Sequence, residues 1–238
     1  MIAIYKREMR SYFTSPVGYM FYALFFAISG FLFTLNTVQA GEKAFYPNYF
    51  NMILYLFVII IPLLTMKLIS EERQMRTDQL ITTAPVTLAG IVIGKYLAAL
   101  TMFGSAFIVS SILYHIPLAM YGNPNGAMYA GCVFGVFLVG SAFIAIGIFI
   151  SSLTENQFIS ALGTITAIIF FLLVGNLANF INNEAVRRFF INISVTMRYS
   201  QFASGIFSYD TLLYFISISA VFLFLTVRVF EKRRWSKS

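Results

Sequence analysis

The sequence predicts an all-α integral membrane protein with six transmembrane helices and cytoplasmic N- and C-termini. Hydrophobic residues make up 59% of the chain and charged residues only 11%, whereas a soluble domain has about 25% charged residues. Six apolar runs of about 20 residues are each long enough to cross a bilayer. The 27 Phe and 14 Tyr fit aromatic belts at the two interfaces. We expect residues 1–238 to form a single transmembrane domain.

Residues 1–15 predict an amphipathic helix that lies on the membrane before the first span. Apolar side chains recur at helical spacing in MIAIYKREMRSYF, and the basic side chains lie off that stripe. Such a helix binds flat at the interface. Because a residue before proline avoids helical geometry, the Ser15–Pro16 pair should end it. The stripe consists of Ile2, Tyr5, Met9, Tyr12 and Phe13, and the basic residues are Lys6, Arg7 and Arg10.

Six spans are predicted, and their flanking charges set the orientation. An even number of spans places both termini on one side, which would carry twelve of the sixteen Lys and Arg residues. Basic loops stay in the cytoplasm, so we expect cytoplasmic termini and a basic inner face that meets anionic lipid. We attribute the C-terminal EKRRWSKS to the same lipid contact and expect no nucleic-acid partner. The spans cover residues 17–38, 50–69, 91–120, 128–153, 158–181 and 211–230.

The segment 70–90, between the second and third spans, is rich in charge for this chain. Five of the nine residues in SEERQMRTD are charged. Two glutamates stand first, where the helix dipole favours them, and Glu72 and Arg76 form an i,i+4 pair in the favourable order. The TTAP that follows should end this helix. Since a plain helix connection needs only about 2–8 residues, the segment predicts a cytoplasmic docking surface.

Later parts of the chain predict packing and a structured outer loop. Gly131 and Gly135 form a GxxxG at the start of span four, which allows close helix approach. GNPNGAM, at 122–128, reads as a short outer loop. In the outer segment 182–210, Asn183 should cap a helix with Arg187 and Arg188 at headgroup level. The apolar residues of that helix are Val186, Phe189, Phe190 and Ile193.

No residue pattern points to catalysis or to a metal site. The sequence has no G-x-x-x-x-G-K-[ST] motif, so ATP phosphates should be bound by another chain. His115 is the only histidine, and we interpret it as a packing residue. Cys132 is the only cysteine and supplies neither a disulfide nor a metal pair. For Asn176 and Asn179 in span five, we favour helix–helix hydrogen bonding over a role in lining a pathway.

The stretch EERQMRTDQLITTAPV, followed by IVIGKYLAAL, resembles the region between the second and third spans of ABC-2 type permeases, close to the gliding-motility branch. Arg76 stands where that pattern usually has Gly, and Gln79 where it has Glu. ISSLTENQFISA, at 150–161, resembles the cytoplasmic turn between spans four and five. RYSQFASGIFSYDTLLYF, at 198–215, resembles the outer segment before the last span. The matching residues in the first stretch are Glu71, Glu72, Arg73, Thr77, Leu80, Thr83, Pro85, Val86, Ile91, Val92, Gly94 and Lys95.

The resemblance implies one half of an exporter. Two permease subunits, identical or homologous, would pair in the membrane, and separate ATPase subunits carrying ATP and Mg²⁺ would dock beneath them. This chain would then be no enzyme and bind no cofactor itself, and short re-entrant helices within 182–210 would close the exit path. The residues implied to couple to the ATPase are Glu71, Glu72, Arg73, Met75, Arg76, Thr77, Leu80 and Ile81, with a second cytoplasmic turn at Thr154, Glu155 and Asn156.

Three functions stay open at this point. The first is the permease subunit of an ATP-driven exporter. The second is a non-exporting ABC membrane subunit that transmits ATPase motion to another membrane or envelope complex, and an accessory envelope protein is left open as a partner. The third is an ion-coupled carrier, which we disfavour because such carriers use a buried carboxylate or a discontinuous helix. Here Glu155, Glu184 and Asp210 all fall in predicted loops.

Overall fold

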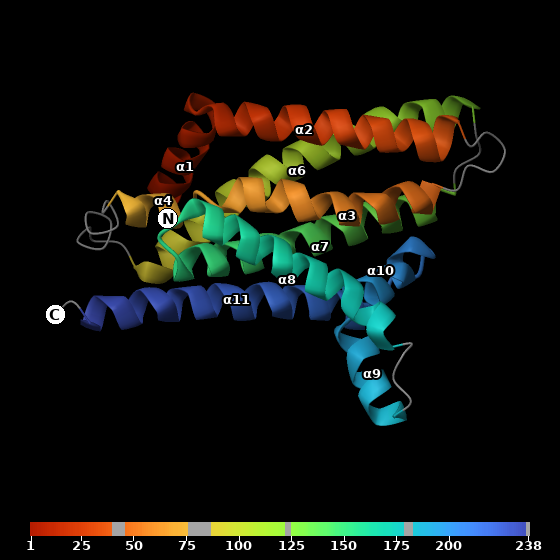
Figure 1. Cartoon of the computed structure of the whole chain (residues 1–238). Coiled ribbons are helices and arrows are strands. Elements are labelled where there is room, and N and C mark those ends of the chain that lie inside the picture. Colours follow the sequence, from red (N-terminus) through yellow and green to blue (C-terminus); the bar gives the residue numbers. More distant parts are fainter. Residues whose placement is uncertain (40–45, 76–86, 122–124, 179–182, 237–238) are drawn as a thin grey trace.

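The computed structural model describes residues 1–39, 46–75, 87–121, 125–178 and 183–236, and every regular element within them is helical. Six of these helical segments are long and apolar enough to cross a membrane, which confirms the predicted fold class. They lie side by side, and both chain termini are at one end of the bundle (Figure 1). We call this the terminal end. The spanning helices are α2 (Pro16–Phe33), α3 (Tyr46–Thr65), α6 (Leu88–Tyr121), α7 (Gly126–Leu153), α8 (Gln157–Leu177) and α11 (Tyr209–Ser236).

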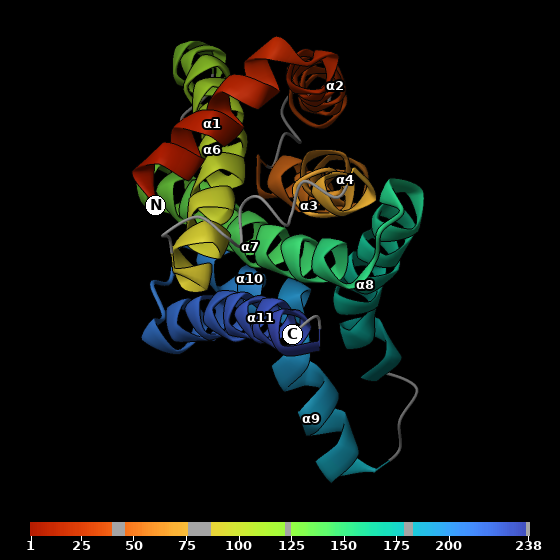
Figure 2. The ribbon, with the colours of Figure 1, turned by 90° about the vertical axis from the view of Figure 1, so that its left-hand side faces the viewer.

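The N-terminal helix α1 (Ile2–Thr14) lies across the terminal end of the bundle, where it packs on α2 and α6 (Figure 2). Ser15 ends it with extended geometry (φ −97°, ψ 153°), and Pro16 opens α2. Proline suits this first helical position because its missing N–H would have no helical partner there. The predicted break between the N-terminal helix and the first span is therefore confirmed, and the interfacial position of α1 stays a prediction.

The core is organised around α7, which packs against α3, α6, α8, α10 (Val195–Ala203) and α11. Gly131 and Gly135 of α7 face α10 of the same subunit. A Cβ on Gly131 would lie 2.4 Å from the carbonyl oxygen of Phe202, and one on Gly135 would lie 3.0 Å from the ring of Tyr199. The GxxxG pattern thus gives close packing within this chain.

Most predicted span boundaries hold within a few residues. The first span includes a π-helical turn after α2 (η1, Thr34–Val38) and reaches its predicted end at 38. α8 ends at Leu177, and the predicted end at 181 lies outside the described residues. α11 continues to Ser236, beyond its predicted end at 230. α6 is 34 residues long, about 50 Å at 1.5 Å per residue, and so extends beyond a hydrocarbon layer of about 30 Å.

Two short helices occupy the predicted outer segment at the end of the bundle opposite the termini. α9 (Glu184–Ile193) starts as predicted, because the Asn183 side chain accepts hydrogen bonds from Ala185 N at 3.0 Å and Val186 N at 3.5 Å. α10 packs into the bundle with Tyr199 and Phe202 buried. α9 instead extends away from the bundle (Figure 2), and none of its residues is buried. Closure of an exit path by these helices stays a prediction.

Candidate functional site

The candidate site is the corner at the terminal end where α3 leads into α4 (Ser70–Gln74). A turn over residues 66–69 joins the two helices. Ser151 of α7 holds this turn, since its Oγ accepts from Ser70 N at 3.1 Å and from Ile69 N at 3.3 Å and donates to Met66 O at 3.3 Å. The Ser70 hydroxyl also donates to Met66 O. The direction of α4 is therefore fixed by hydrogen bonds from inside the bundle.

Lys95 of α6 is the centre of the site. Its side chain is 0% exposed, and its Nζ lies 3.1 Å from Glu8 Oε1 of α1 and 2.8 Å from Glu72 Oε2 of α4. Nζ also donates to Leu68 O at 2.5 Å. An ammonium has three donors, and here each has an acceptor. A buried charge is tolerated in this way only when it is paired and hydrogen-bonded.

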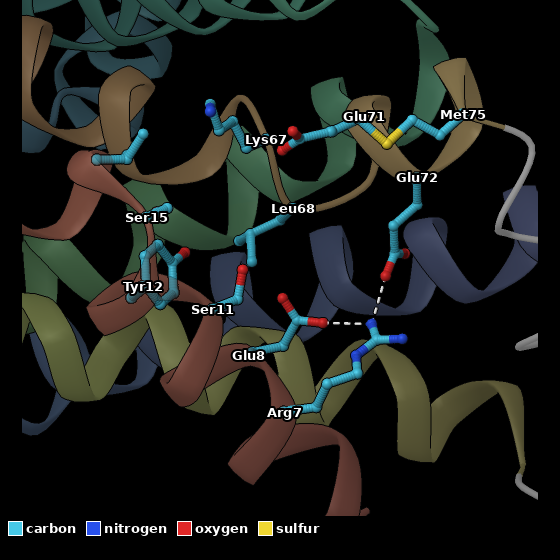
Figure 3. Close-up of a pocket in the computed structure, with 11 residues that line it drawn as sticks. Arg7, Glu8, Ser11, Tyr12, Ser15, Lys67, Leu68, Glu71, Glu72 and Met75 are labelled. Carbon is cyan, nitrogen blue, oxygen red and sulfur yellow. Dashed lines mark hydrogen bonds and ion pairs between the residues drawn. The ribbon is translucent and has the colours of Figure 1, made fainter.

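Arg7 of α1 completes an alternating cluster of two cations and two anions. Its guanidinium is paired with both Glu8 and Glu72, and Figure 3 shows the two contacts. Burial lowers the pKa of Arg7, but the hydrogen bonds and charges of Glu8 and Glu72 outweigh it, so the pKa is raised above its ordinary value. Arg7, Glu8, Glu72 and Lys95 are called the Lys95 cluster below. It joins α1, α4 and α6.

Arg73 joins α4 to the end of α7. The residue is 6% exposed, and its Nη1 donates to Ser152 O and, at 3.2 Å, to Thr154 O. Arg233 of α11 donates to the intervening Leu153 O at 3.3 Å. The last carbonyls of a helix lack helical partners and carry partial negative charge. Two arginines from distant parts of the chain therefore donate hydrogen bonds to the free carbonyls at the C-terminal end of α7.

A hollow of about 500 Å³ lies between α1 and the α3–α4 corner. Its floor includes Tyr12, whose hydroxyl donates to Leu64 O at 2.9 Å. Burial, and after it the charge of Glu8, raises the pKa of Tyr12 well above its ordinary value. Lys67 and Glu71 lie at one side of the hollow (Figure 3). Among the residues that the structure describes, neither takes part in an ion pair. Met75, also on its wall, is 66% exposed.

The structure brings together only part of the predicted coupling set. Glu71, Glu72, Arg73 and Met75 are at the corner, and α4 ends at Gln74. Glu72 and Arg73 bind side chains and carbonyls of their own chain, and their coupling to an ATPase stays a prediction. Arg76, Thr77, Leu80 and Ile81 lie outside the described residues.

The second predicted contact, the turn Thr154–Asn156, lies beside the corner because Thr154 O accepts from Arg73. Glu155 is exposed. Asn156 caps α8, with its Oδ1 accepting from Phe158 N at 2.8 Å. Asn176 lies on the exposed surface of α8, remote from this site. Asn179 is outside the described residues.

Sequence reasoning missed the site role of Glu8 and Lys95. Both carry a signal in the sequence: Glu8 is the only acidic residue before Glu42, and Lys95 is the only charged residue between Asp78 and Glu155. Lys95, as a charge alone in an apolar region, is expected to have a partner. Nothing in the spacing identifies that partner, because Glu8 and Lys95 belong to different helices.

A family model described as ABC-2 family transporter protein matches residues 2–235, nearly the whole chain. A search of curated proteins gives no match.

Proposed function

The chain belongs to the ABC-2 transporter family, and from this premise we propose that it is the permease subunit of an ATP-driven exporter. Proteins of this family are membrane subunits that generally work with ABC ATPases. In the proposed complex, ATP and Mg²⁺ are bound and hydrolysed on separate ATPase subunits, and a second permease subunit, identical or homologous, completes the pathway. The membrane is a bacterial cytoplasmic membrane.

The orientation follows from charge. Arg7, Lys67 and Lys95 lie at the terminal end, together with the basic end of α11, whereas Arg187 and Arg188 lie at the opposite end. Since basic residues favour the cytoplasmic side, this distribution supports a cytoplasmic terminal end. The α3–α4 corner then faces the ATPase.

The single observation that carries the proposal is that buried charged contacts hold α4 against α1, α6 and α7. Its residue Glu72 binds Lys95 of α6 and Arg7 of α1, and its residue Arg73 binds the carbonyls at the end of α7. A displacement of α4 therefore acts directly on α1, α6 and α7, and through the α7–α8 turn on α8. A simple linker between two spans needs no such buried charged contacts, which cost desolvation energy.

The outward side of the same corner provides the ATPase contact. Met75 is exposed, Glu71 is half-buried, and neither takes part in the Lys95 cluster. Protein interfaces use apolar side chains for anchorage and rim charges for orientation, and these two residues supply one of each. Arg76, Thr77, Leu80 and Ile81, which the resemblance also implies in coupling, lie outside the described residues.

Affinity purification of the tagged permease from its native host, with identification of any ABC ATPase that is retained, tests the proposal. Wild-type permease should retain the ATPase through affinity purification, and Met75→Asp should lose most of it. Met120→Asp is the matched control, because Met120 is a similarly exposed methionine (74% against 66%) near the C-terminal end of α6, away from the α3–α4 corner. Equal ATPase retention by both variants would contradict the proposed contact.

Export is tested separately in inside-out vesicles that contain the intact pair. Vesicle contents are compared by mass spectrometry with ATP and with a non-hydrolysable analogue. Accumulation of a compound only with ATP is the expected result. Retention of the ATPase without ATP-dependent accumulation would instead favour the non-exporting, motion-transmitting subunit, and loss of both would remove the ABC assignment of function.

A further inference from the structure

The helix α9 has a position in the fold that the transport proposal does not explain. It follows α8, whose 21 residues span about 30 Å at 1.5 Å per residue, close to the hydrocarbon thickness of a bilayer. α8 starts at the terminal end, so its far end reaches the opposite membrane boundary. α9 begins just beyond that point and runs across the direction of the spans (Figure 1).

The junction between α9 and α10 is packed against the bundle. Ser194 separates α9 from α10, and its Oγ accepts from Met197 N at 3.3 Å. A Cβ on Gly175 of α8 would lie 2.2 Å from that Oγ, so only glycine allows this approach. The Tyr214 hydroxyl of α11 donates to Ile193 O at 2.5 Å. Three helices therefore fix the last turn of α9, and its crosswise direction is set by packing.

The side chains of α9 are divided between two faces. Val186, Phe189, Phe190 and Ile193 recur at i, i+3, i+4 and i+7, which places them on one face of a helix. Val186 is 41% and Phe189 63% exposed, although both are apolar. The opposite face carries Glu184, Arg187, Arg188 and Asn192.

The two arginines differ in their partners. Arg188 forms an i,i+4 ion pair with Glu184 at 2.7 Å, with both side chains about three-quarters exposed. No ion pair or side-chain hydrogen bond joins Arg187 to another residue of the described chain. An exposed guanidinium next to an apolar face is suited to a phosphate, which it binds with two parallel hydrogen bonds.

We propose that α9 is an interfacial helix of the outer leaflet that binds phospholipid. Val186 and Phe189 enter the upper acyl region, and Arg187 and Arg188 bind headgroup phosphates. Amphipathic helices with aromatic residues on one face and basic residues on the other lie in this way at a membrane surface. Lipid is favoured over a second protein copy because a stable interface needs about 800 Å² per partner, more than one face of a ten-residue helix presents.

A spin-label scan in nanodiscs containing phosphatidylglycerol tests the proposal. Single cysteines replace Val186, Phe189, Arg188 and Asn192 in a Cys132→Ala background, and each label is measured for collision with oxygen, which concentrates in lipid, and with a water-soluble nickel chelate. Labels at 186 and 189 should favour oxygen, and labels at 188 and 192 should favour nickel. The measurement uses the permease alone, so its outcome is independent of ATP-driven export.

Two results would overturn the proposal. If the label at 189 is as accessible to nickel as the label at 192, α9 lies in water. If the label at 189 is shielded from both reagents and shows dipolar broadening between labels, a second copy covers the face. Arg187→Gln with Arg188→Gln should reduce the phosphatidylglycerol retained in native mass spectrometry. Arg187→Lys with Arg188→Lys, which keeps both positive charges, is the control and should retain more phosphatidylglycerol than the glutamine variant.

Discussion

Replacing Lys95 with methionine should test the Lys95 cluster most directly. Methionine keeps much of the side-chain length but removes the ammonium that contacts Glu8, Glu72 and Leu68 O. Glu8, which is buried, and Glu72, whose side chain is 18% exposed, then share the single cation Arg7. Removing one partner from a buried ion pair costs about 3–5 kcal/mol, because the charge left behind is uncompensated. Arg7 neutralises part of that charge, so we expect the lower limit, about 3 kcal/mol.

This loss is measurable as a lower melting temperature of the purified permease. For a chain of 150–250 residues, 1 kcal/mol corresponds to about 2–4 °C, so the Lys95→Met variant should melt about 6–12 °C below wild type. Lys232→Met is the control, because that side chain is exposed and surface substitutions usually stay within about 0.5 kcal/mol.

A second substitution distinguishes pairing from simple packing. In Lys95→Met combined with Glu8→Gln, the remaining charges are Arg7 and Glu72, which still pair with each other. The double variant should therefore be more stable than Lys95→Met alone, although it contains one more change. Non-additivity of this kind is the signature of residues in one network. If the two losses simply add, or if Lys95→Met melts like wild type, the assignment of Lys95 as the central cation is wrong.

Three further predictions concern the corner and the topology. Arg73→Lys should cost about 1–3 kcal/mol, because a single ammonium replaces the wide guanidinium that contacts Ser152 O and Thr154 O; an unchanged melting temperature would count against this contact. Tyr12→Phe should cost about 1 kcal/mol through the lost hydrogen bond to Leu64 O, and a variant as stable as wild type would refute it. In a Cys132→Ala background, a membrane-impermeant maleimide should label a cysteine at Arg188 in intact cells but not one at Lys232, and the reverse pattern would invert the topology.

The spans were predictable because a bilayer imposes a length and a composition on each helix separately. The register of α1 was not. The apolar stripe placed Tyr5, Met9 and Tyr12 toward the membrane, whereas the structure buries Ile4, Glu8 and Tyr12 against the protein. Glu8 is on the buried face because it forms an ion pair there with Lys95 of α6. A pairing between helices that far apart in the chain leaves no periodicity in the sequence.

The sequence predicts where the candidate site lies, but not which of its residues face outward and which bind the bundle. Charge density identified the corner after α3, and Glu71 and Met75 do lie on its outer surface. The sequence could not separate them from Glu72 and Arg73, because all four are within five residues of one polar run. Glu72 and Arg73 lie on the inner side because Lys95 of α6 pairs with Glu72 and the last carbonyls of α7 accept hydrogen bonds from Arg73.

The use of ions at this corner bears on its motion. A buried ion pair is often no more stable than apolar residues of similar volume, so stability alone does not account for four charges here. Each acid of the Lys95 cluster contacts two cations, and each cation contacts two acids. If α4 moves and Glu72 separates from Lys95, Glu72 retains Arg7, and Lys95 retains Glu8 and Leu68 O. An apolar contact offers no such second partner, since its packing is lost once the surfaces separate. The cluster therefore lets α4 shift against α6 while no charge is left unpaired, which is the property that the proposed coupling to an ATPase requires.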